Sequence, residues 1–172
     1  MNKITQLCII LGMIVISATA QQADVKGAFL EKWENSKIYM LAIAEAMPEE
    51  YYDFKPTERQ MTFKEQLMHI KSNMDWLSGT YFSTSESERG KNILPTTKAE
   101  TIAILSEAFN NTKSILEKVP LKDLKETVTF FAGDKSKLQI LNLLQDHVTH
   151  HRGQLIVYLN LNEIEPPGFV GW

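Results

Sequence analysis

Residues 136–161, SKLQILNLLQDHVTHHRGQLIVYLNL, decide the fold. Apolar residues recur at three- to four-residue spacing along this stretch, which predicts an amphipathic helix with one buried face. That face holds Leu141, Leu144, Val148, Leu155, Tyr158 and Leu159. Ser136 and Gln139 form a capping box, in which each side chain satisfies a free backbone amide at the start of the helix. At 1.5 Å per residue, such a helix is roughly 39 Å long.

Three more helical segments precede it, at residues 25–46, 62–80 and 97–119. Each shows apolar residues at helical spacing. Two of them open with further capping boxes, Thr62 with Glu65 and Thr97 with Glu100. Four long helices in succession predict an all-α fold, a four-helix bundle. Because two connections are longer than a dozen residues, we expect at least one of them to cross the length of the bundle.

The connection before the last helix contains a short β-branched run, residues 127–131, TVTFF. The sequence shows no second strand to pair with this run, and an isolated strand is not stable. We therefore expect an ordered connector that covers one end of the bundle and finishes at Gly133 and Asp134.

The first twenty residues have the pattern of a leader peptide. Lys3 gives a basic start, residues 4–16 are an apolar run, and residues 18–20, ATA, have the form of a signal peptidase site. We expect residues 1–20 to be cleaved as a signal peptide. The remaining residues, 21–172, are expected to form a single domain that is exported to the periplasm or secreted. The apolar run is shorter than the about 20 residues of a membrane-spanning helix, so no stable membrane anchor is expected.

Composition excludes several classes of function. The sole cysteine, Cys8, lies in the leader, so the mature chain has no disulfide, no thiolate metal ligand and no cysteine nucleophile. A formal net charge of −3 and the lack of a basic cluster argue against nucleic acid binding. The expected partner is a small-molecule substrate, and the apolar tail, residues 165–172, would permit a homodimer.

Three of the four histidines of the chain fall within five positions of the last predicted helix. Residues four apart share a helix face, so His147 and His151 point the same way, as two ligands of one metal ion must. They share that face with Leu144 and Leu155, where unpaired imidazole nitrogens would be costly. His69 adjoins the apolar seam of the second predicted helix and could supply a third ligand.

The third clustered histidine, His150, could replace one of this pair by its i, i+3 spacing from His147. It lies about 100° around the helix from His151, so all three cannot bind one ion. We favour the pair His147 and His151 because it follows the apolar face. His150 is then a supporting group, a residue at the pocket mouth or a solvated side chain. Candidates for side chains that orient the ligands by hydrogen bonds are Gln154, Asn73 and Glu65.

The run HVTHHRGQL, residues 147–155, resembles the signature of the DinB/YfiT-like family of small metal-binding helix bundles. The resemblance extends to the link after the first helix, the ligand region of the second helix and the ending, at residues 46–57, 63–70 and 162–167. It implies a divalent ion held by one histidine of the second helix and a pair four apart on the last, here His69, His147 and His151. The export signal departs from the pattern, since many members are cytoplasmic.

The resemblance implies a range of activities: some related proteins are thiol-dependent transferases or isomerases, and many others are taken to be metal-dependent hydrolases. Three neutral nitrogen ligands leave an open position on a zinc-like ion, which is the form of a catalytic site. Water bound there has a pKa near about 7, and export favours water over a cytosolic thiol. We expect one divalent ion, zinc or nickel, and hydrolysis of a small molecule by metal-bound water. The alternatives are a thiol-dependent S-transferase or isomerase and a non-enzymatic metal- or ligand-binding bundle.

Overall fold

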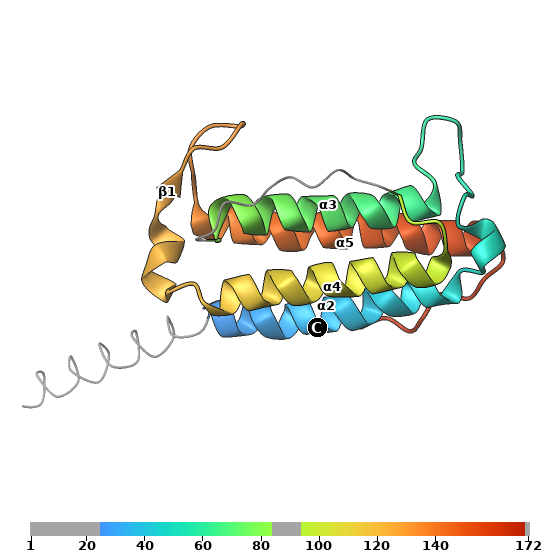
Figure 1. Cartoon of the computed structure of the whole chain (residues 1–172), viewed down its shortest axis with the longest axis horizontal. Coiled ribbons are helices and arrows are strands. Elements are labelled where there is room, and N and C mark those ends of the chain that lie inside the picture. The colour runs from blue at the N-terminus through green and yellow to red at the C-terminus, as the bar shows by residue number, and fades with distance from the viewer. Residues whose placement is uncertain (1–24, 84–93, 171–172) are drawn as a thin grey trace, which may run out of the picture. The chain divides into compact units, whose positions relative to one another are not determined.

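A computed structural model describes residues 25–83 and 94–170 (Figure 1). Within these residues the main elements are four helices, α2 (Val25–Ala46), α3 (Phe63–Tyr81), α4 (Lys98–Glu117) and α5 (Lys137–Leu161). The predicted all-α four-helix fold is confirmed, and the helices begin and end close to the residues expected from the sequence. None of the helices in this described part is both long and apolar enough to cross a membrane. The predicted leader, residues 1–20, lies outside the described residues.

The chain divides into two units between Glu31 and Lys32. Of the first unit, the structure describes only residues 25–31, which form the opening turns of α2. The second unit holds the rest of α2 together with α3, α4 and α5.

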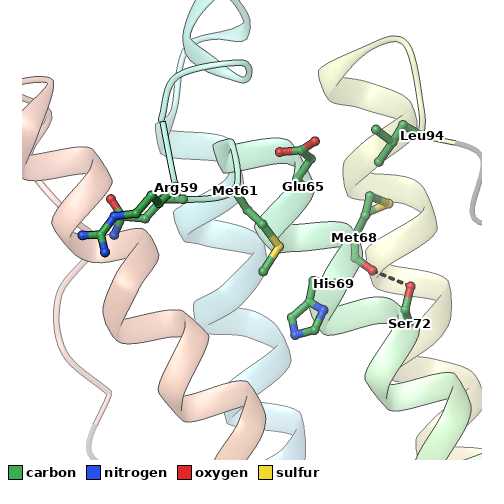
Figure 2. A pocket seen from close by; sticks show the side chains of 8 residues that line it. Arg59, Met61, Glu65, Met68, His69, Ser72 and Leu94 are labelled. Atoms are coloured by element: carbon green, nitrogen blue, oxygen red, sulfur yellow. Dashed lines mark hydrogen bonds between the residues drawn. The ribbon is translucent and has the colours of Figure 1, made fainter. Parts of the chain in front are cut away.

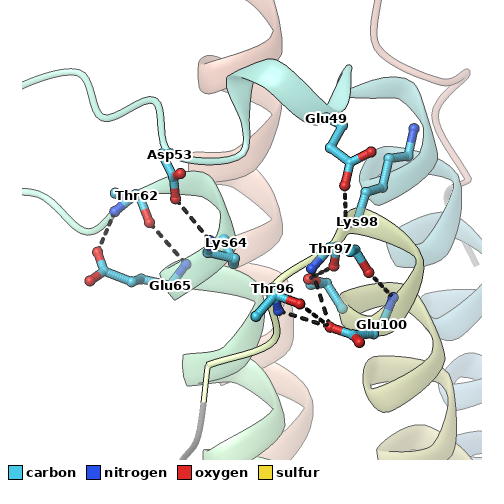
Figure 3. Close-up of polar contacts among 10 residues, drawn as sticks. Glu49, Asp53, Thr62, Lys64, Glu65, Thr96, Thr97, Lys98 and Glu100 are labelled. Carbon is cyan, nitrogen blue, oxygen red and sulfur yellow. Dashed lines mark hydrogen bonds and ion pairs between the residues drawn. The ribbon is translucent and has the colours of Figure 1, made fainter.

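Three of the helices start at the capping boxes that the sequence predicts. At α3, the Thr62 hydroxyl accepts a hydrogen bond from the Glu65 amide at 3.1 Å, and the Glu65 carboxylate accepts one from the Thr62 amide at 2.7 Å (Figure 3). The same reciprocal pattern occurs at Thr97–Glu100 and at Ser136–Gln139. Each box involves residues only three apart, so a short stretch of sequence is enough to reveal it.

Helices α3 and α4 begin at the same end of the bundle, beside the 3-10 turn η1 (Glu49–Tyr51). The Lys64 amide donates to the carbonyl of Tyr52 at 2.9 Å, and the Lys98 amide donates to the carboxylate of Glu49 at 3.1 Å (Figure 3). Because α3 packs against α4, the two are parallel neighbours (Figure 1). The end of α3 at Tyr81 and the start of α4 at Lys98 therefore lie at opposite ends of the bundle, as the predicted crossover requires, and residues 84–93 of that connection lie outside the described residues.

The core of the second unit is built from the apolar stripes of its helices. On α3 and α5 the fully buried members include Leu67, Ile70, Met74, Leu77, Leu144, Val148 and Leu155. Trp33 of α2 is also fully buried, and its indole N–H donates to the carbonyl of Phe109 in α4 at 3.1 Å. The two rings also pack together, with centroids 5.0 Å apart. Helix α3 packs against α5 as well as α4, and this α3–α5 face carries the histidines.

A small β-hairpin lies between α4 and α5, after the 3-10 turn η2 (Leu121–Lys125). Strand β1 (Thr127–Val128) pairs antiparallel with β2 (Lys135–Ser136). The expectation that the 127–131 run has no partner strand is therefore wrong. The partner is two residues long and leads directly into α5, so it leaves no alternating pattern in the sequence. Gly133 has a φ of 88° in the turn, a conformation that favours glycine.

Candidate metal site

Three imidazoles meet between α3 and α5. His69 comes from α3, and His147 and His151 come from successive turns of α5. One ring nitrogen from each lies within 4.8 Å of the others. Nε2 of His147 is 3.1 Å from Nε2 of His69, and the ring of His151 is 4.6 Å from that of His69 between centroids. The structure thus brings together the three histidines selected from the sequence, in positions that can hold a metal ion.

The distance between two of these nitrogens fits a tetrahedral ion. Two nitrogens bound at about 2.0–2.1 Å to one tetrahedral zinc lie roughly 3.3 Å apart, close to the 3.1 Å between His69 and His147. A direct hydrogen bond between these two rings would also fit that distance, but it would not explain the third imidazole beside them. Nδ1 of His147 is buried and has no hydrogen-bond partner among the described residues.

Hydrogen bonds determine the protonation of His151. Its Nδ1 lies 2.7 Å from the Oε1 atom of Gln66 and 3.0 Å from that of Gln154. Amide oxygens only accept hydrogen bonds, so Nδ1 must carry the proton. Nε2 of His151 is therefore left with a free lone pair, as a metal ligand requires.

A short chain of hydrogen bonds orients the Gln66 amide. Its Nε2 donates to Oε1 of Gln154 at 2.8 Å and lies 3.5 Å from the hydroxyl of Tyr158. The Tyr158 hydroxyl in turn donates to the carbonyl of Met61 at 2.8 Å. Because the NH2 group of Gln66 has these acceptors, its oxygen is turned toward His151. Gln66 and Tyr158 are both buried, so the network is held rigidly within the bundle.

All three histidines are kept neutral by their surroundings. Burial, reinforced by the neighbouring imidazoles of His151 and His69, lowers the pKa of His147 to about 3. Burial, with a smaller contribution from His69, lowers the pKa of His151 to about 4. Burial also lowers the pKa of His69. Neutral imidazole is the form that binds a metal, so these rings need not lose a proton at neutral pH.

His150 lies outside this group. Its side chain is exposed, and its Nε2 lies 3.1 Å from the Nε2 atom of Gln154, from which it accepts a hydrogen bond. Its ring is perpendicular to that of His151, with centroids 4.9 Å apart. His150 is therefore a solvent-facing neighbour that contacts the site through Gln154.

The three candidates for orienting side chains differ in what they contact. Gln154 accepts from His151, in keeping with the role expected from the sequence. Glu65 is instead engaged by the backbone of Thr62. Asn73 has a buried Oδ1 without a hydrogen-bond partner among the described residues. Gln66 was not among the residues selected from the sequence. Its position three residues before a candidate ligand was the one signal available there, and its burial appears only in the structure.

A pocket of about 430 Å³ lies against His69 (Figure 2). It is lined by Arg59, Gln60, Met61, Glu65, Met68, His69, Ser72 and Leu94. One of these residues is connected to the histidine site, because the Met61 carbonyl accepts a hydrogen bond from the Tyr158 hydroxyl, whereas Glu65 belongs to the cap of α3. Its volume lies within the roughly 300–1,000 Å³ typical of small-molecule sites.

Fold and site together define a helix bundle with a three-histidine cluster next to a pocket. Residues 20–170 match the sequence model of the DinB family, and the chain belongs to that family. The uncharacterized protein YjoA of Bacillus subtilis is 23% identical over 120 residues, which cover 68% of this chain and 77% of YjoA.

Two solved structures share the fold. The DinB-like protein YjoA of Bacillus subtilis superposes with a TM-score of 0.71 at 20% identity, covering 83% of this chain and 96% of YjoA. A DinB-like protein from Bacillus cereus gives a TM-score of 0.69 at 19% identity, covering 83% of this chain and 95% of the other. At such low identity these likenesses bear on the fold alone.

Proposed function

We propose that His69, His147 and His151 bind one divalent metal ion, zinc or nickel, and that the protein is a hydrolase of a small molecule. The observation that carries this proposal is the convergence of three neutral imidazoles beside the pocket at His69. When bound, a divalent ion supplies a Lewis acid that lowers the pKa of water to about 7.

The residues of the chain have separate tasks in this proposal. Gln66 and Gln154 hold His151 in the tautomer whose Nε2 can bind the ion. The low pKa of His147 keeps its ring available well below neutral pH. In this proposal a small molecule binds in the pocket next to His69, and the lining of that pocket by His69 supports it. Three ligands from the protein leave room for a fourth, external ligand.

A thiol-dependent transferase or isomerase is the second candidate. Among the described residues that line the pocket, Glu65 is the only carboxylate, and its oxygen accepts from the Thr62 amide at 2.7 Å. Hydrolysis gains from a general base within reach of water, whereas direct binding of a thiolate needs none. The shortage of free carboxylates therefore favours this candidate as the one to compare with hydrolysis.

Metal content and activity test the proposal in that order. Elemental analysis of the purified protein is expected to find one zinc or nickel ion per chain, lost in His147→Ala and kept in His150→Ala. The metal-loaded protein is then assayed with small esters and amides, with and without an added low-molecular-weight thiol. Turnover without thiol supports the hydrolase, and turnover only with thiol supports the transferase. Wild-type protein that takes up no metal would refute both.

We also propose that residues 1–20 direct export of the protein. Their basic start, apolar run and ATA site support this role. Mass spectrometry of the protein recovered from the producing cells is expected to find a chain that starts at Gln21. A chain that keeps residues 1–20 and stays in the cytoplasmic fraction would contradict export.

A further inference from the structure

The candidate metal site has no negative charge of its own. His151 is hydrogen-bonded to the neutral amides of Gln66 and Gln154. Within residues 25–83 and 94–170, no carboxylate is hydrogen-bonded to His69, His147 or His151. A divalent ion held there would keep its full double positive charge, which an external anion can offset.

The one acidic residue of the pocket lining does little to offset that charge. Glu65 accepts from the backbone amide of Thr62 and sits in the first turn of α3. The positive end of the helix dipole lies at this turn, so the carboxylate is already compensated. The described residues of the pocket wall therefore add no uncompensated negative charge to the site.

Arg59 is the one basic residue of the lining, and the described residues offer it no ion-pair partner. Two lysines in the same region differ in this respect. Lys55 pairs with Glu58 at 2.6 Å, and Lys64 pairs with Asp53 at 2.9 Å. The Arg59 side chain is exposed at the edge of this pocket, where its guanidinium can meet the end of a ligand.

Apolar side chains contribute to the pocket wall between Arg59 and His69. Figure 2 shows the Met61 side chain between Arg59 and His69, and the lining also includes Met68 and Leu94. Thioether side chains adapt to ligands of different shape. A ligand that fits this pocket would carry a negative group for Arg59, an apolar body, and a reactive group beside His69.

We propose that the substrate is a small carboxylate whose charged end is bound by Arg59 while its apolar body lies on Met61. This inference rests on the proposed function of the histidine site. A carboxylate suits a single guanidinium because two parallel N–H···O bonds satisfy both of its oxygens. A phosphate would leave a third oxygen without a partner.

A set of hydroxamates tests the inference without any knowledge of the substrate. Cobalt-substituted protein is titrated with monohydroxamates of succinic, adipic and suberic acid and with their methyl esters, followed by the visible spectrum of the cobalt. The hydroxamate binds the metal in every compound. The ratio of the affinities of acid and ester therefore measures the contribution of the carboxylate to binding. One chain length is expected to favour the acid about tenfold. Arg59→Ala should abolish that preference.

Lys55→Ala is the matched control, because it removes an equal charge from the same link and Lys55 does not line the pocket. It is expected to keep the preference for the acid. Equal affinity of acid and ester at every length, or an unchanged preference in Arg59→Ala, would overturn the inference while leaving the metal site intact. Failure of the protein to take up cobalt would refute the proposed function instead. In that case the affinities of the metal-free protein for octanoate and for octanamide would be compared. Only octanoate carries the carboxylate that Arg59 is proposed to bind, so this comparison would still test the inference.

Discussion

Oε1 of Gln66 and Nδ1 of His151 lie 2.7 Å apart, although the two residues are separated by 85 positions in the chain. This contact joins α3 to α5 within the candidate site. Because the oxygen can only accept, it selects one of the two neutral forms of the imidazole. The buried glutamine is thus as much a part of the site as the histidine that it contacts.

Replacing Gln66 should weaken metal binding. Gln66→Leu removes the acceptor that orients His151, and such losses typically reduce metal affinity about 10–100-fold. Gln66→Glu keeps an acceptor and is expected to bind metal at least as tightly as the wild type. Competition with a chromophoric zinc chelator measures both affinities. Gln154→Ala, which removes the longer of the two contacts, should cost less; an unchanged affinity in Gln66→Leu would contradict this account.

The three clustered imidazoles should act as one unit toward metal. Substituting alanine for His69 or His151 is expected to reduce bound metal from one ion per chain to a small fraction of that. His150→Ala is the control on the same helix, and should retain the metal because its side chain faces solvent. Elemental analysis after gel filtration measures the difference. Equal loss in all variants would mean that the site depends on the helix as a whole.

The metal-free protein should lose stability in mild acid. The folded chain holds the pKa of His147 at about 3 and that of His151 at about 4, whereas an unfolded histidine titrates near about 6.5. Between these values the unfolded chain binds more protons, so the free energy of unfolding falls as the pH is lowered from about 6.5 toward 4. Urea unfolding at several pH values measures this slope.

The double variant His147→Gln/His151→Gln tests whether these two histidines cause the dependence of stability on pH. It removes both low-pKa groups and should flatten the dependence of stability on pH. His150→Gln should leave the slope as in the wild type. A slope that persists in the double variant would assign acid sensitivity to other groups.

Helix α5 should depend strongly on its buried stripe. Leu144 is fully buried, and shortening it to alanine is expected to cost about 2–5 kcal/mol of unfolding free energy. Val157 on the same helix is 52% exposed, so Val157→Ala should cost less than about 0.5 kcal/mol. Urea unfolding of both variants gives the comparison. Similar costs at the two positions would contradict the packing of this helix.

The fold was largely predictable because its signals are local. Thr62, Thr97 and Ser136 each bond to a residue three positions on, and the apolar stripes repeat within single helices. The histidine pair on α5 follows from the same spacing rule. His69 joins the site through a contact with His147, which lies 78 positions away in the chain. In the sequence, only its place beside an apolar seam and the family resemblance indicated this role.

The parts that the sequence did not reveal depend on distant contacts. Gln66 acquires its role from His151, and in the sequence it is one polar residue among several on α3. Strand β2 is too short for an alternating pattern, so its pairing with β1 appears only in the structure. Arg59 lines the pocket and has no ion-pair partner among the described residues, whereas Lys55 pairs with Glu58 and lies outside the lining, and both differences appear only in three dimensions.

The order of the helices has a consequence for the newly made chain. His69 lies in α3, and the ligand pair lies in α5, after the crossover, α4 and the hairpin. A polypeptide whose synthesis has reached only α4 carries one histidine of the candidate site and an α3 seam without its α5 partner. Under the proposed function, metal uptake would therefore begin only after the C-terminal helix has been made and has docked, so that loading of the site would be a late event in the life of the chain.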